Sequence, residues 1–339
     1  MKKRLALLLL FSLLAFVLAG CGGGRGEALP ASGPEEATAP TPIPTPVTPD
    51  FDPEDLHPLL WRVSDDGGHT LYLFGTIHVG DGRNPLVLEK LAPILTSCDA
   101  LAVEFDLVAY EQDLSAAVAD YQQFVYQDGS SVRDHMPEEL YERCVALLTE
   151  ASAYSPLLDR YNLGMWSQLT ETAALLTRSS LDPNFAMDRL LIQRAYDEGI
   201  PVLSVESASF QMGLLNSFPD ELNLLLMEET LDGLDGYGEE IDALYAAWLA
   251  GDAGDLERLV LGEEDADAGD FDEEQLAMIE AYNRAMLDQR NLGMARTALA
   301  YLAGGDTVFL AVGAGHMLGE SGLVRLLSSA GCTVEPVTP

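Results

Sequence analysis

Two histidines in matching contexts are the residues of this sequence best suited to chemistry. His78 closes the segment 70–78, and His316 closes the segment 307–316. In both segments an apolar run rich in β-branched and aromatic residues, which is typical of a buried strand, reaches a glycine three residues before the histidine. A lone histidine after a strand is more often an ordinary loop residue. Two in repeated settings, among only five histidines in the chain, favour a function.

Two glutamates occupy comparable positions near the ends of other predicted strands. Glu104 lies in the apolar run 99–105, and Glu206 ends the run 200–206. Imidazole and carboxylate groups together suit a divalent Mn, Co, Zn or Fe ion, and the residues do not choose among these metals. Such an ion activates water, and a carboxylate that is not fully used as a ligand can act as a general base. Each glutamate could instead form a salt bridge at the edge of a sheet.

The spacing of these strands predicts how the four residues are positioned. A helix is predicted over residues 85–97, between the strands that carry His78 and Glu104. The order strand, helix, strand is typical of a βαβ unit with parallel strands. Both side chains then emerge at the carboxyl edge of the sheet, where open α/β sheets bind their ligands.

The end of the chain repeats the plan of its start. A long helix is predicted over residues 272–302, followed by the His316 strand, a helix over 320–329 and a last strand over 333–337. We therefore predict an α/β fold of two related βαβ-containing halves, with a helical insertion between them.

The predicted insertion, about residues 218–275, is the most acidic part of the chain and contains one basic residue, Arg258. We expect it to be peripheral, with a solvated face. Its acidic run 263–267 lacks the ordered spacing and the glycine of an EF-hand calcium loop, so it is interpreted as a solvated loop.

The first residues predict export and a lipid anchor. Basic residues at positions 2–4 precede an apolar run over 5–18, which is too short to span a bilayer comfortably. The run ends Leu-Ala-Gly-Cys at Cys21, which resembles a lipobox and implies cleavage before Cys21 and lipidation of its thiol. We expect a signal peptide over residues 1–20, a Pro-rich disordered tether over 21–54 and the folded domain over 55–339.

The net charge excludes some classes of binding partner, and the cysteines allow two arrangements. The net charge of −37 argues against nucleic acid and against adhesion to anionic lipid surfaces, both of which require basic residues. Solubility outside the cell is the simplest account of this acidity. Of the three cysteines after Cys21, Cys98 and Cys332 both precede strands and could form a disulfide, or they could remain buried thiols; Cys144 then has no partner assigned.

Taken together, these motifs resemble the TraB/PrgY/GumN family, which includes the Tiki metalloproteases. The resemblance spans roughly residues 61–337 and rests mainly on the ordered pair of Gly-x-x-His motifs. The acidic insertion has no counterpart that we can match, and Met317 stands where leucine is usual. The matching segments are 71–78, 102–104, 187–188, Ala195, 199–206, Arg290-Asn291 and 312–319.

The resemblance implies a fold like that of the erythromycin esterases and ChaN, and metal-dependent hydrolysis of a peptide or protein. It places His78, Glu104, Glu206 and His316 around the metal, with both glutamates available for catalysis. Arg290 would bind substrate or an oxyanion, with Asn291 beside it, or Arg290 would instead form a salt bridge to a glutamate. Two other functions stay open: a non-catalytic envelope protein that sequesters a peptide, and a metal-free esterase-like hydrolase.

The lipobox yields a test that needs no structure. A Cys21→Ser chain cannot be lipidated, so we expect it to be released from the membrane or to stay unprocessed. Cell fractionation and the mass of the mature protein measure this. Normal maturation and full membrane retention of the variant would contradict the predicted anchor.

Overall fold

The computed structural model of the chain describes residues 53–262 and 271–339. The predicted signal peptide, Cys21, nearly all of the predicted tether and the acidic run 263–267 lie outside these residues. Within them the fold is mixed α/β, with a six-stranded sheet in the order β4-β3-β5-β2-β1-β6. The strands are β1 Leu60–Ser64, β2 Thr70–Thr76, β3 Ala100–Val103, β4 Val202–Ser204, β5 Val308–Gly313 and β6 Thr333–Pro336.

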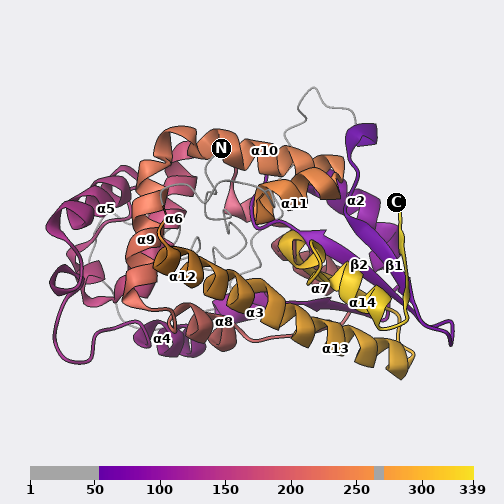
Figure 1. Cartoon of the computed structure of the whole chain (residues 1–339). Coiled ribbons are helices and arrows are strands. Elements are labelled where there is room, and N and C mark those ends of the chain that lie inside the picture. Colours follow the sequence, from indigo (N-terminus) through magenta and orange to yellow (C-terminus); the bar gives the residue numbers. More distant parts are fainter. Residues whose placement is uncertain (1–52, 263–270) are drawn as a thin grey trace, which may run out of the picture.

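Helices surround this sheet and extend well beyond it. The sheet lies toward one end of the molecule, and α5, α6 and α9 lie at the other end (Figure 1). The helices are α2 Asn84–Leu95, α3 Leu107–Gln112, α4 Leu114–Gln122, α5 Glu138–Glu150, α6 Leu163–Arg178, α7 Met187–Glu198, α8 Ala208–Leu215, α9 Asp220–Asp232, α10 Leu234–Ala250, α11 Ala253–Leu261, α12 Glu273–Asn283, α13 Gln289–Gly304 and α14 Leu323–Ser329.

The central strands are parallel, as the spacing predicts. Strands β4, β3, β5 and β2 pair in parallel, whereas β1 pairs antiparallel with both β2 and β6. Every residue of β3 and β5 is buried, in keeping with their apolar sequences. Strand β5, from the far end of the chain, lies between β2 and β3, so segments from both ends of the chain contribute neighbouring strands to one sheet.

The two Gly-x-x-His motifs contact one another where their strands end. Gly75 pairs with Val312, and Thr76 pairs with Gly313. A Cβ atom at Gly75 would lie only 3.1 Å from the Cα atom of Ala314. Position 75 therefore favours glycine, because a side chain there would crowd the second motif.

The acidic insertion is not peripheral, contrary to the expectation from its charge. Trp248 of α10 is 1% exposed, and its indole Nε1 donates a hydrogen bond of 2.8 Å to the carbonyl oxygen of Gly75. Tyr245, one turn earlier, donates to Oδ1 of Asn84 at 2.7 Å. The apolar side chains of α10 are buried on one face of the helix, so the insertion packs against the end of the His78 strand.

The helices also differ in detail from those expected from the sequence. Pro156 begins a 3₁₀-helix over Pro156–Arg160, and α6 begins after it at the capping residue Asn162. The long helix predicted over 272–302 is interrupted by a π-helical segment over Arg284–Asp288.

In the described part of the chain, the three cysteines after Cys21 are free thiols. None of the described helices is both long and apolar enough to cross a membrane.

Candidate functional site

The carboxyl ends of four neighbouring parallel strands deliver the predicted residues to one edge of the sheet. The spatial order β4, β3, β5, β2 presents Glu206, Glu104, His316 and His78 along that edge in the same order. Adjacent strands lie about 4.8 Å apart, so side chains from neighbouring strands can interact directly. The backbone shows this closeness too, because the amide of Glu206 donates to the carbonyl oxygen of Glu104 at 2.8 Å.

Arg290 of α13 connects the two glutamates. Its Nη2 lies 2.6 Å from Oε2 of Glu104 and 2.7 Å from Oε2 of Glu206. Its Nε donates to both oxygens of Glu206, at 3.0 and 3.1 Å, and its Nη1 donates to the carbonyl oxygen of Met286. The guanidinium is therefore engaged in a buried salt bridge, the second of the two roles that the sequence left open for it.

Gln211 of α8 completes this network, and the sequence analysis missed it. The residue is 3% exposed, and its Nε2 donates 2.9 Å hydrogen bonds to Oε2 of Glu104 and to Oε2 of Glu206. Helix α8 is capped by Ser207, which directly follows Glu206. A glutamine in the first turns of a helix that follows a strand-ending glutamate is the signal that could have indicated it.

Glu104 points its other oxygen toward His316. Its Oε1 accepts a 2.8 Å hydrogen bond from the amide of Gly313 and lies 3.7 Å from Nε2 of His316. Burial alone would raise the pKa of Glu104, but the positive charge of Arg290 and the neighbouring imidazoles outweigh it and lower the pKa to about 2. Glu104 is therefore a carboxylate at every physiological pH.

His316 is held by Asn291, the residue after Arg290. Nδ1 of His316 lies 2.6 Å from Oδ1 of Asn291, whose Nδ2 donates to the carbonyl oxygen of Ser321 at 2.8 Å. Because the amide oxygen accepts, Nδ1 of His316 carries the proton and Nε2 presents its lone pair. Burial lowers the pKa of His316 to about 3, so the imidazole is neutral. Asn291, predicted to bind substrate, thus has both ends of its amide engaged within the protein.

His78 is held in a similar way by a residue of the matching segment 187–188, to which the sequence analysis gave no role. Its Nδ1 lies 2.7 Å from Oδ2 of Asp188, in the first turn of α7, and Thr76 donates to Oδ1 of Asp188 at 2.7 Å. Burial opposes the charged imidazole, but the Asp188 carboxylate outweighs it and raises the pKa of His78 to about 9. Nε2 of His78 is buried and has no hydrogen-bond partner among the described residues.

Three of the four predicted ligands, His78, His316 and Glu104, have nitrogen or oxygen atoms of the kind that bind divalent metals. An oxygen atom beside Nδ1 orients each imidazole, as is usual for histidines that bind metals through Nε2. Glu104 has Oε1 beside His316, whereas both oxygens of Glu206 accept from Arg290. In their present positions, the described side chains include no group of three or more His, Cys, Asp or Glu that could hold an ion.

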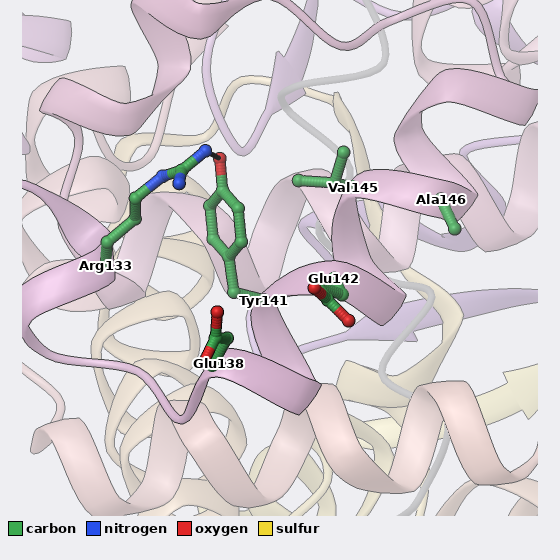
Figure 2. Close-up of a pocket in the computed structure, with 6 residues that line it drawn as sticks. All are labelled: Arg133, Glu138, Tyr141, Glu142, Val145 and Ala146. Atoms are coloured by element: carbon green, nitrogen blue, oxygen red, sulfur yellow. Dashed lines mark hydrogen bonds between the residues drawn. The ribbon is translucent and has the colours of Figure 1, made fainter.

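A pocket elsewhere on the described part of the chain involves none of these residues. Figure 2 shows a pocket beside the start of α5, with a volume of about 320 Å³. Arg133 stacks over the ring of Tyr141, with Cζ 4.4 Å from the ring centre, and donates to its hydroxyl oxygen at 2.9 Å. The lining residues are Arg133, Glu138, Tyr141, Glu142, Val145 and Ala146.

Comparison with known proteins agrees with the motifs at the strand ends. A model of the TraB/PrgY/gumN family matches residues 59–336. The chain belongs to this family. It is 23% identical over 267 residues to the uncharacterized protein YbaP of Escherichia coli strain K12, covering 77% of this chain and 89% of that protein. YbaP of Shigella flexneri matches with the same identity and coverage. No solved structure matches the chain.

The ion pair of His78 and Asp188 predicts a pH-dependent stability in the metal-free protein. Because the folded pKa of His78, about 9, exceeds the ordinary value of 6.5, the pair stabilises the fold fully below pH 6.5, and this is lost as pH rises through 9. Asp188→Asn should therefore lower the free energy of unfolding by about 3 kcal/mol at pH 6 and by much less at pH 10.

Denaturant unfolding in the presence of a chelator measures this difference. The matched control is Asp65→Asn, which removes the carboxylate beside the more exposed His69 and should cost much less, because solvent screens the pair. An Asp188→Asn penalty that is equal at both pH values would contradict the assigned charge of His78.

Proposed function

We propose that this protein is a membrane-anchored, extracytoplasmic, metal-dependent hydrolase of the peptidase kind. The observation that carries the proposal is the pair of imidazoles at the ends of neighbouring parallel strands, each oriented through Nδ1, with the Glu104 carboxylate beside them. Membership of the TraB/PrgY/gumN family supports it, as does the resemblance of the motifs to those of the Tiki metalloproteases.

In this proposal His78, His316 and Glu104 hold the ion, and Glu206 does not. A bound Mn, Co, Zn or Fe ion would supply an activated water and would polarise a substrate carbonyl. Three protein ligands leave one position of the ion for water. Catalytic metal sites have such an open position, whereas structural sites are closed by four protein ligands. Because the side chains are not gathered around a common point, binding requires the imidazoles and the carboxylate to approach one another.

The remaining residues of the site orient these ligands. Asp188 and Asn291 fix the two rings, so that each presents Nε2 to the site. A carboxyl group with a pKa of about 2 is a weak base, because proton transfer is most efficient when the pKa lies near the working pH. Glu104 is therefore better suited to holding a cation than to accepting a proton.

Location and origin are further parts of the proposal. The apolar run and the lipobox before Cys21 support a lipid-anchored protein outside the cytoplasm, and residues 22–54 would tether its domain to the membrane. The repeated Gly-x-x-His motif, carried by adjacent strands, supports an origin of the sheet from two related βαβ-containing halves.

A metal-free hydrolase is the second candidate. The observation that favours it is the contact between His78 and Asp188, because a carboxylate beside Nδ1 also orients a histidine for proton transfer. In that case His78 would exchange protons with substrate, and the site would not depend on an ion.

Metal content and turnover of the full chain, purified in detergent, test the proposal. We expect about one divalent ion per chain, with loss of metal affinity by tenfold or more in His78→Gln and in His316→Gln. The control His69→Gln removes an exposed histidine and should change nothing. A chelator should abolish hydrolysis of a peptide library, and added Mn²⁺ or Co²⁺ should restore it.

Three outcomes contradict the proposal in different ways. Hydrolysis that survives complete removal of metal would favour the metal-free enzyme. Peptide binding without turnover, whether or not metal is present, would favour a sequestering protein. Metal uptake that both histidine variants retain would place the ion elsewhere in the chain.

A further inference from the structure

We infer that Gln211 is a positioning residue of the candidate site. It ties one oxygen of Glu104 to one oxygen of Glu206, and it thereby keeps the other oxygen of Glu104 directed toward His316. The meaning of this role for catalysis rests on the proposed function, whereas the orientation of Glu104 itself does not.

The hydrogen bonds of Gln211 are the first observation behind this inference. A side-chain amide carries two N–H groups, so its nitrogen can serve two acceptors at once. Nε2 of Gln211 does this, at 2.9 Å from Oε2 of Glu104 and 2.9 Å from Oε2 of Glu206. Nη2 of Arg290 contacts the same two oxygens, so two donors bridge a pair of carboxylates that would otherwise repel each other.

The contacts of Arg290 with the two glutamates are unequal. Two nitrogen atoms of Arg290, Nε and Nη2, contact Glu206. Nη2 also contacts Glu104. Glu104 is also held at its other oxygen, Oε1, by the amide of Gly313. The Gln211 amide adds a second direction of restraint at Oε2 of Glu104.

The restraint acts on the oxygen that faces His316. With Oε2 of Glu104 fixed by two donors, Oε1 stays within 2.8 Å of the Gly313 amide and 3.7 Å of Nε2 of His316. This is the oxygen that would contact a metal in the proposed function. A group that fixes a ligating carboxylate is expected to change metal affinity by 10- to 100-fold when it is removed.

The variant Gln211→Met tests this role. Methionine has a similar length and no donor, so it removes both hydrogen bonds without leaving a large cavity or an unpaired charge at position 211. Gln193→Met on α7 is the matched control, because the Gln193 amide donates to Asp197 at the surface. If Gln211→Met does not fold, Gln211→Asn replaces it, since this change keeps the amide but shortens its reach.

Two readouts on the full chain in detergent separate positioning from stability. In a titration with Co²⁺ alone, we expect the dissociation constant of Gln211→Met to rise about tenfold, while the control and the melting temperature stay nearly unchanged. In the metal-free protein, NMR should show a shifted Nε2 resonance of His316 in Gln211→Met and an unshifted one in the control.

The two readouts also distinguish failure of this inference from failure of the proposed function. If the wild-type chain takes up Co²⁺ and Gln211→Met matches it in both affinity and His316 resonance, Gln211 has no positioning role, although the proposed function stands. If the wild-type chain takes up no Co²⁺, the metal-dependent function fails. The His316 resonance then decides the inference, which an unshifted signal would overturn.

Discussion

The buried guanidinium of Arg290, shared between Glu104 and Glu206, is the interaction on which the candidate site depends. Arg290 is 3% exposed, and a charge removed from water to this degree costs several kcal/mol unless it is paired. Its two partners follow β3 and β4, so the pairing fixes α13 against two strand ends. The next residue, Asn291, holds His316 after β5. Two consecutive residues of one helix therefore organise three of the four strand ends that form the site.

Much of this arrangement could be predicted from the sequence because it follows from local pattern. Apolar runs that stop at glycine indicate strands, and the strand–helix–strand spacing around His78 and Glu104 indicates parallel pairing at one edge. The position of β5 between β2 and β3 could not be predicted in this way, because it depends on which distant strands pair. That position is what brings His316 next to Glu104.

The partners of the predicted residues were missed for a different reason. Asp188 and Gln211 belong to helices, and their proximity to His78 and Glu104 arises from packing of α7 and α8 against the sheet, which the spacing of the strands does not encode. Net acidity also concealed the buried face of α10, where Trp248 reaches Gly75. A charged segment was interpreted as peripheral because charge reports only the solvated face of a helix.

The most direct test of a shared metal site is a crystal structure of the chain soaked in Mn²⁺, with the ion located by anomalous diffraction. We predict one strong anomalous peak, from an ion ligated by Nε2 of His78, Nε2 of His316 and Oε1 of Glu104, while Arg290 stays paired with Glu206. A peak ligated by Glu206 with Arg290 displaced would contradict the account. So would the absence of any peak at this edge of the sheet under saturating Mn²⁺.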